Sequence, residues 1–383
     1  QSEENSIILF VQFLVLILNI LVYLTISSPV FAIIDPLAVP NNKIGIHILF
    51  PDEIEVAAKL VNNDRQGAWG YVVIPIQSTD RDHLKWQKFF DNCKKLQIIP
   101  IIRIATTTNG PHWDPPNEFD LLDFSNFLND LKWPTQNRYI IFFNEVNRAD
   151  EFGGQVSPEK YADSLNLAID IFKSKSEDFF ILPAGLDNAA NDRKTSLKWN
   201  LYLDHMYRHR PDIFNKIDGW VSHSYPNPDF SARPDASGEN KIDSFLYDLK
   251  QLKKYTNKTL PIFITETGWS NKYLSDHQIS LYYQYAFDKV WQSGQIVTVA
   301  PFLLDAQDGP FEQFSFLDAD HNFKEFAIEL SNRATKGEPV VPTIIIPTPE
   351  ITATVSAVLG YKTPSENFFQ KLYNLLRHAY YSW

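Results

Sequence analysis

The sequence predicts an α/β fold of the (β/α)₈ barrel type, and three observations lead to this prediction. Eight short apolar stretches alternate with amphipathic helical stretches between Lys43 and Thr335. Most of the apolar stretches are continuous rather than alternating, as in parallel strands that are buried on both faces. No Gly-rich phosphate loop follows the first strand, and an open doubly wound sheet, the main alternative, rarely needs eight successive units.

Each expected strand is a run of four to nine residues rich in Ile, Val, Phe and Leu. The expected strands are Ile44–Leu49, Tyr71–Ile76, Ile98–Ile104, Tyr139–Phe143, Phe179–Leu182, Gly219–Ser222, Pro261–Thr265 and Ile296–Leu304. Between them, apolar residues recur at helical spacing. The expected helices are Ile54–Val61, Trp86–Leu96, Leu121–Leu131, Pro158–Phe172, Leu197–Arg208, Ile242–Leu252, Ile279–Val290 and Phe323–Leu330.

The two ends of the chain differ from this barrel region in composition. Residues 7–26 are almost continuously apolar, and small residues follow up to Ala32, so residues 1–32 predict a signal peptide or membrane anchor, with a buried core helix as the alternative. Residues 336–383 begin with repeated prolines and predict a Pro-rich linker and tail. We therefore expect a catalytic domain at 41–335 in a protein that is extracellular, either secreted or attached to the membrane through residues 7–26.

Composition excludes several classes of function. The 35 Lys and Arg residues against 46 Asp and Glu residues give a formal charge of −11, and no basic cluster is present. This balance argues against nucleic acid as a partner. Cys93 is the only cysteine, which excludes an intrachain disulfide and a cysteine metal cluster.

Polar side chains follow several of the expected strands, where barrel enzymes carry their catalytic groups. Two of these strands, at 139–143 and 261–265, deliver a glutamate directly after an apolar run. The polar residues expected at this mouth are His47, Arg103, Asn144, Glu145, His223, Tyr225 and Glu266. Two carboxyl groups at one site are the groups required to cleave a glycosidic bond, one as a proton donor and one as a nucleophile or base. A nearby cation such as Arg103 would keep one of the two ionised.

These motifs resemble those of clan A of the retaining glycoside hydrolases, also called the 4/7 superfamily of TIM-barrel enzymes. The resemblance covers about Lys43 to Thr335 and depends on Asn144-Glu145, His223-Ser-Tyr225 and Thr265-Glu266-Thr-Gly-Trp269 in this order. It implies that Glu145 is the acid/base and Glu266 the nucleophile. It also implies that Asn144 binds the 2-hydroxyl of the sugar and that Tyr225 donates a hydrogen bond to the nucleophile.

One departure from this group concerns the first sugar subsite. The group usually carries a tryptophan at the end of strand eight, whereas this chain has Phe302 in Pro301-Phe-Leu-Leu-Asp305. Phe302 or Trp269 is the expected replacement as the sugar platform, and Trp113 is a further candidate for stacking. His47, His112 and His223 raise the question of a metal, but no His-x-His pair follows strand one, and we expect neither a metal nor a cofactor.

The sequence thus predicts a retaining glycoside hydrolase that acts on β-linked oligo- or polysaccharides. The alternative is a catalytically inactive barrel that binds carbohydrate at the cell surface. The missing strand-eight tryptophan favours the alternative, and the two intact glutamates favour the enzyme. We further expect Glu266, rather than Glu145, to carry hydrogen bonds from both Tyr225 and Arg103.

Overall fold

Eight parallel strands form the centre of the molecule in the computed structural model, which describes residues 33–63, 67–306 and 309–337. Their bounds are β1 Gly45–His47, β2 Gly70–Ile76, β3 Ile98–Ile104, β6 Arg138–Phe142, β7 Phe179–Pro183, β8 Trp220–His223, β9 Ile262–Glu266 and β10 Ile296–Val299. Each lies within a few residues of a strand expected from the sequence. The α/β class and the parallel pairing are therefore confirmed.

The strands pair in two sheets, with orders β1-β2-β3-β6-β7 and β10-β9-β8. Every pairing within these two sheets is parallel. Single parallel bridges link them, Ile44 with Val299 on one side and Asp187 with His223 on the other. The carboxyl ends of the eight strands therefore point the same way, which places the residues after each strand near one another.

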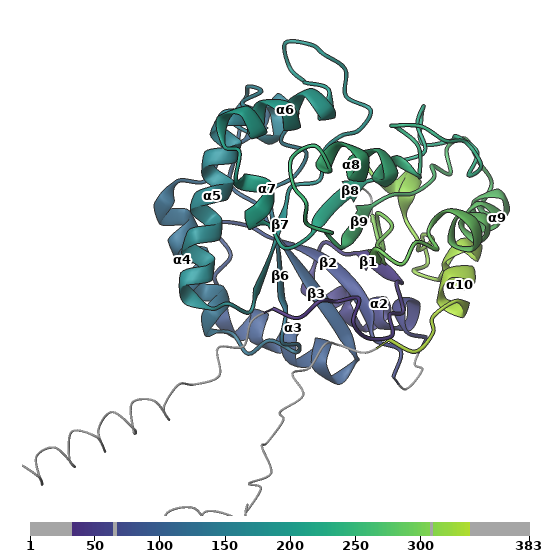
Figure 1. Ribbon diagram of the computed structural model, residues 1–383. Coiled ribbons are helices and arrows are strands. Elements are labelled where there is room, and N and C mark those ends of the chain that lie inside the picture. Colours follow the sequence, from purple (N-terminus) through teal and green to yellow (C-terminus); the bar gives the residue numbers. More distant parts are fainter. Residues whose placement is uncertain (1–32, 64–66, 307–308, 338–383) are drawn as a thin grey trace, which may run out of the picture. The chain divides into compact units, whose positions relative to one another are not determined.

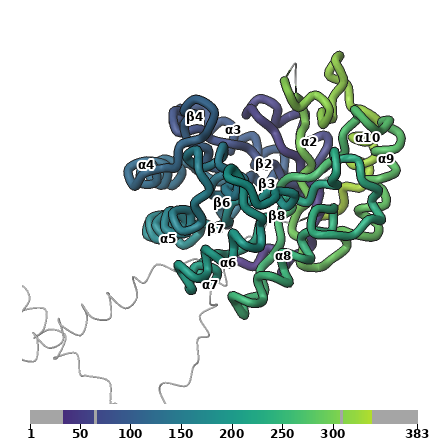
Figure 2. Tube along the Cα trace, turned by 90° about the horizontal axis from the view of Figure 1, so that it is seen from above, coloured from purple at the N-terminus to yellow at the C-terminus, as the bar shows by residue number. Residues whose placement is uncertain are grey.

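Helices surround the strands in both views (Figures 1 and 2). Their bounds are α2 Ile54–Val61, α3 His83–Lys95, α4 Glu118–Asp130, α5 Pro158–Lys175, α6 Trp199–His209, α7 Ile213–Lys216, α8 Ser244–Leu252, α9 Asp276–Tyr285 and α10 Glu325–Asn332. Several begin at a side-chain cap: Asp82 accepts from the amide of Lys85, and Asn117 forms a reciprocal capping box with Asp120. Pro158 at the start of α5 lacks the amide hydrogen that a first helical turn leaves unbonded.

The apolar core has two parts, and each follows from one face of the strands. One set of strand side chains packs against the helices and includes Val72, Ile102 and Ile140. The alternate set of strand side chains points inward, and the chain at Ile33 and Leu37 packs against it. This set includes Tyr71, Ile101, Tyr139 and Phe263. Alternation along parallel strands produces both layers, so the continuous apolar runs of the sequence are explained.

Shorter elements connect strands to helices at the carboxyl ends. They are β4 Thr108–Asn109, β5 His112–Trp113, η1 Pro51–Glu53, η2 Ala149–Glu151 and η4 Glu312–Phe314. The π-helix η3 Ala286–Val290 instead continues α9 on the way to β10. Among the described residues, no helix is long and apolar enough to cross a membrane. The expected anchor at 1–32 and nearly all of the expected tail at 336–383 lie outside the described residues.

Candidate active site

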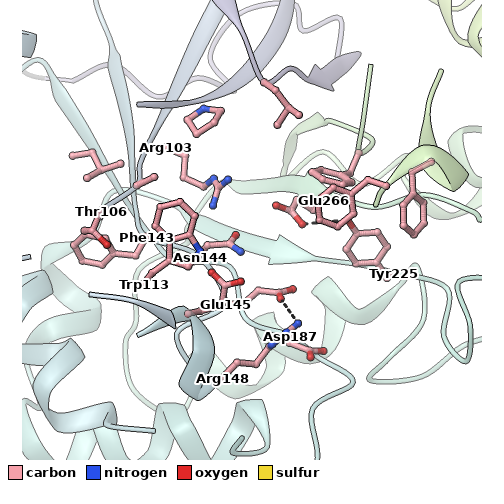
Figure 3. A pocket seen from close by; sticks show the side chains of 18 of the residues that line it. Arg103, Thr106, Trp113, Phe143, Asn144, Glu145, Arg148, Asp187, Tyr225 and Glu266 are labelled. Atoms are coloured by element: carbon pink, nitrogen blue, oxygen red, sulfur yellow. Dashed lines mark hydrogen bonds and ion pairs between the residues drawn. The ribbon is translucent and has the colours of Figure 1, made fainter. Parts of the chain in front are cut away.

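A cavity of about 510 Å³ opens at the carboxyl ends of the strands, and both glutamates line it (Figure 3). Glu266 is the last residue of β9, and Glu145 follows β6 by three residues. The backbone at Phe143 and Glu145 is left-handed, with φ angles of 76° and 32°. Such conformations cost free energy in residues other than glycine and concentrate at functional sites. This bend brings the chain out of the sheet and turns the Glu145 carboxylate into the cavity.

The Glu145 carboxylate has two nitrogen partners. Arg148 Nη1 donates to Glu145 Oε2 at 3.1 Å, and His223 Nδ1 lies 3.1 Å from Glu145 Oε1. Arg148 also binds both carboxylate oxygens of Asp150, through Nε at 3.2 Å and Nη2 at 2.7 Å. These hydrogen bonds to Asp150, together with the charge of Glu145, raise the pKa of Arg148 despite its partial burial. Arg148 is therefore a fixed positive charge beside Glu145.

The Glu266 carboxylate lies near one hydroxyl and two imidazole rings. The hydroxyl of Tyr225 donates to Glu266 Oε2 at 3.2 Å, which confirms the expected hydrogen bond. His47 Nε2 lies 4.0 Å from Glu266 Oε1. Burial is the main cause that lowers the pKa of His47, and the charges of Arg103 and His223 lower it further. His47 is therefore neutral near pH 7. It lies near the Glu266 carboxylate but does not line the cavity.

His223 lies between the two glutamates. Its Nδ1 is 3.1 Å from Glu145 Oε1 and 3.7 Å from Glu266 Oε2. Burial alone would lower the pKa of His223, but the neighbouring Glu266 and Glu145 carboxylates outweigh it, and the pKa of His223 is raised. A proton on this imidazole therefore offsets part of the repulsion between two close carboxylates.

Arg103 does not take the place that the sequence suggested. Among the described residues, no hydrogen bond or ion pair joins Arg103 to Glu266, so that expectation is wrong. The physical reason is that Arg103 projects from β3, where its charge acts on His47, His223 and Glu151 instead. Its Nε is buried without a hydrogen-bond partner in the described part of the chain.

Asn144 lies in the same cavity, beside Arg103 in Figure 3. Its Oδ1 atom is buried and has no hydrogen-bond partner among the described residues. Burial is the main cause that raises the pKa of Glu151, and the neighbouring Asn144 side chain counteracts it. Buried polar atoms in native proteins are nearly always bonded, so an unpartnered oxygen in a residue that lines the cavity is unusual.

Sequence reasoning missed three charged residues of this cavity: Arg148, Glu151 and Asp187. Burial, and secondly the charge of Glu145, raises the pKa of Glu151 to about 7 and also raises the pKa of Asp187. All three lie on loops after β6 and β7, beyond the strand ends to which the sequence argument was confined. A signal was present, because Arg148 lies three residues after Glu145 and is followed closely by two acids.

The opposite wall of the cavity is aromatic. It is lined by Tyr225, Phe230, Phe302, Phe311 and Phe314, and Phe302 contacts Phe311 edge to face at a centroid distance of 5.1 Å. Trp113, on β5, lines the side nearer Asn144. Phe302 therefore lines the cavity, and its role as a sugar platform stays a prediction.

Trp269 requires a correction, because it does not line this cavity. It is only 2% exposed, packs edge to face on Tyr283 at 4.9 Å, and donates its indole hydrogen to the carbonyl of Ala232 at 2.8 Å. Gly268, with a φ angle of 148°, redirects the chain after Glu266 and sends Trp269 into the helical layer. Trp269 is therefore a core residue and cannot serve as a sugar platform.

Glu145, His223 and Glu266 are also the one group of described residues with metal-binding geometry. One nitrogen and two carboxylate oxygens from them lie within 4.8 Å of one another. Zinc accepts such a donor set. Arg148 and Tyr225 already bind the two carboxylates, however, and a cation here would compete with these contacts.

Comparisons with known proteins give a family match. The profile of the family described as "Glycosyl hydrolase catalytic core" matches residues 112–326, which is 215 of the 383 residues. This span contains both glutamates. A comparison with curated protein sequences gives no significant match.

Three solved structures illustrate the similarity in fold. A family 39 glycoside hydrolase from Bacteroides cellulosilyticus WH2 has a TM-score of 0.53 at 16% identity, over 80% of this chain and 65% of its own, just under two thirds of its length. A glucosidase from Croceicoccus marinus has a TM-score of 0.58 at 9% identity, over 78% and 68%. The exo-β-1,4-mannosidase Op5Man5 from Opitutaceae bacterium strain TAV5 has a TM-score of 0.55 at 13% identity, over 80% and 61%. At these identities the likeness concerns the fold alone.

Proposed function

Since the chain belongs to the glycosyl hydrolase catalytic core family, we propose that it hydrolyses O-glycosidic bonds in β-linked oligo- or polysaccharides by a retaining double displacement. In this proposal Glu145 is the acid/base and Glu266 the nucleophile. The substrate is carbohydrate, and no cofactor takes part. The eight strands are proposed to form a closed (β/α)₈ barrel.

One observation carries the proposal. A carboxylate oxygen of Glu145 and one of Glu266 lie within 4.8 Å of each other in the same cavity. Retaining enzymes hold their two carboxyl groups about 5–5.5 Å apart, whereas inverting enzymes hold them about 6.5–9.5 Å apart to admit a water molecule. The short separation leaves room for the sugar carbon to react with Glu266 directly.

The reaction then has two steps. Glu266 attacks the anomeric carbon while Glu145 gives a proton to the leaving oxygen, which forms a glycosyl ester and frees the alcohol. Glu145 next takes a proton from water, the water oxygen attacks the anomeric carbon, and Glu266 is released. His223 contacts both carboxylates, and Tyr225 holds Glu266 Oε2, so both groups stay oriented through the cycle.

Two substitutions test the assignment of roles. We expect Glu266→Ala to lower kcat by roughly 10⁴-fold or more, because no covalent intermediate forms. We expect Glu145→Ala to lower turnover of unactivated glycosides by about 10²–10⁴-fold. Aryl glycosides with good leaving groups should still react, and azide should accelerate them because it attacks the intermediate without needing a base.

The measurement is steady-state hydrolysis of p-nitrophenyl β-glycosides and of a polysaccharide panel, with proton NMR of the first anomer released. Release of the β-anomer first supports retention, and release of the α-anomer would exclude it. Wild-type turnover of natural glycosides by Glu145→Ala would reject Glu145 as the acid.

A carbohydrate-binding protein without turnover is the second candidate, and one observation favours it. Phe302 stands where the related enzymes usually carry a tryptophan, and a phenylalanine ring offers a smaller stacking surface. Binding of an oligosaccharide that is equally tight in the wild type and in Glu266→Ala, without turnover by either, would support this candidate. Secretion or membrane attachment through residues 7–26 remains part of the proposal in both cases.

A further inference from the structure

A second pocket adjoins the cavity on the side of Glu145. It has a volume of about 810 Å³, within the range of pockets that enclose small ligands. The two hollows share Arg148, Asp187 and Ala189 as lining residues. Figure 3 shows Arg148 and Asp187 beyond Glu145, on the side away from Arg103. We call this hollow the outer pocket.

The wall of the outer pocket is held in place by hydrogen bonds of Asn147, which is fully buried. Its Nδ2 donates to the carbonyls of Asp187 and Leu197, each at 3.0 Å, and its Oδ1 accepts from the amide of Asp187 at 3.0 Å. The amide of Ala149 donates to the carbonyl of Thr195 at 2.8 Å. One buried side chain thus ties both ends of the loop from 187 to 197, so the pocket is formed before any ligand binds.

The lining of the outer pocket suits an uncharged ligand with many hydroxyl groups. Asn191, Thr195 and Ser196 supply neutral donors and acceptors. Two arginines and two aspartates also line it, so their charges offset one another. The Arg148 guanidinium is already bound to Glu145 and to both oxygens of Asp150, which leaves it a poor partner for a ligand carboxylate.

We propose that the outer pocket binds the leaving-group part of the substrate, so that the preferred substrate is an uncharged oligosaccharide that continues past the cleaved bond. This inference rests on the proposed function, because it takes Glu145 as the proton donor. The leaving oxygen must face that donor, and the outer pocket is the hollow that continues from Glu145 past Arg148.

The test uses Ala190→Trp, which fills the outer pocket at a residue that does not line the first cavity. Lys194→Trp is the matched control, because Lys194 is exposed on the same loop and lines neither hollow. For each protein the ratio of kcat/KM on a β-1,4-linked hexasaccharide to kcat/KM on the p-nitrophenyl β-glycoside of the same sugar is measured. Gluco and manno series are both used.

We expect Ala190→Trp to lower this ratio about ten-fold or more, as the loss of a well-fitted sugar contact does, and Lys194→Trp to leave it unchanged. Thr195→Ala, which removes a hydroxyl without adding bulk, should lower the ratio in the same direction and covers the case in which the tryptophan variant does not fold. An unchanged ratio in both pocket variants, or an equal fall with Lys194→Trp, would overturn the inference.

A binding measurement separates this inference from the proposed function. The hexasaccharide is titrated calorimetrically into Glu266→Ala, with and without Ala190→Trp. The difference in Kd measures the contribution of the outer pocket to binding in the absence of turnover. If the wild type hydrolyses nothing but Ala190→Trp still weakens binding about ten-fold, the hydrolase proposal fails and the pocket assignment stands. If binding is unaffected by Ala190→Trp, the pocket assignment fails whatever the catalytic result.

Discussion

Two buried polar regions border the candidate active site, and they differ in how their hydrogen bonds are used. Around β1, β3 and β6, both ring nitrogens of His47, Arg103 Nε and Asn144 Oδ1 have no partner among the described residues. We call these three residues the open cluster.

Beside β8, by contrast, Ser222 Oγ donates to Asp248 Oδ2 at 2.6 Å and lies 3.1 Å from Ser224 Oγ. Ser244 Oγ donates to Ser224 Oγ at 3.0 Å, and Asn188 Nδ2 donates to Asp248 Oδ1 at 3.4 Å. We call these five residues the bonded network.

The open cluster holds buried polar atoms without hydrogen-bond partners, whereas the bonded network holds polar groups that bond to one another beside β8. An unpartnered buried polar atom costs about 1–3 kcal/mol, so an open cluster lowers the stability of the empty protein. A bonded network leaves no such cost and holds the end of β8, which carries His223 and leads to Tyr225. Substitutions in the open cluster should therefore affect activity, and substitutions in the bonded network should affect stability.

The largest expected effect comes from the open cluster. Asn144→Ala removes an amide side chain that lines the cavity, and we expect kcat/KM to fall by roughly 10²–10³-fold, as for loss of one preorganised hydrogen-bonding group. The free energy of unfolding should stay level or rise, since an unsatisfied atom is removed. Urea denaturation and steady-state kinetics on an aryl β-glycoside measure both. A large loss of stability with little loss of activity would reverse the comparison.

The second-largest expected effect is a pH-dependent change in the free energy of unfolding when the bonded network is altered. Burial raises the pKa of Asp248 to about 6, above its ordinary value of 3.8, although Ser222 and Asn188 counteract this. Ionisation of Asp248 therefore costs folding free energy, and the cost grows as pH rises from about 4 to 6 and stays constant above. Asp248→Asn removes this cost.

The stability of Asp248→Asn relative to wild type should thus rise by up to roughly 3 kcal/mol across this pH window. Urea unfolding at pH 4, 5, 6 and 7 measures the difference. Asp130→Asn is the control for loss of a carboxylate outside the network, because Asp130 is exposed at the end of α4. A flat difference for Asp248→Asn would show that the network compensates the charge fully.

The smallest effect is expected for Tyr225, which lines the cavity and donates a hydrogen bond to Glu266. Burial, followed by the charges of Glu266 and Glu145, raises the pKa of Tyr225 far above neutrality, so its hydroxyl remains a donor at all working pH values. We expect Tyr225→Phe to lower kcat by about 10–150-fold, because a hydrogen bond to a charged group contributes about 1.5–3 kcal/mol. The acidic limb of the pH–rate profile should move upward. An unchanged kcat and limb would show that His223 alone orients Glu266.

Most of the fold and the central residues of the site could be predicted from the positions at which the expected strands end. Parallel strands with continuous apolar runs end at the same side, so the sequence alone predicts that Asn144, Glu145, Tyr225 and Glu266 lie together. Trp269 was misplaced by the same reasoning, because the reversal at Gly268 depends on a backbone angle that the residue pattern does not specify.

The loop residues were not predictable for a different reason. Arg148 and Asp187 reach the cavity through backbone bridges and the Asn147 side chain, which join segments far apart in the sequence. Periodicity describes one strand or helix at a time and carries no information on such pairings. The expected ion pair between Arg103 and Glu266 failed because residue type alone does not say which carboxylate a guanidinium reaches.

The reactivity of Cys93 can report local opening of the structure around α3. It is the single thiol of the chain, lies on α3 with 0% exposure, and burial raises its pKa. A thiol reagent can therefore reach it only when the layer between α3 and the strands separates from its neighbours. The labelling rate with a disulfide reagent would then give the opening equilibrium of this layer directly, and the variants above could be ranked by it without introducing any probe.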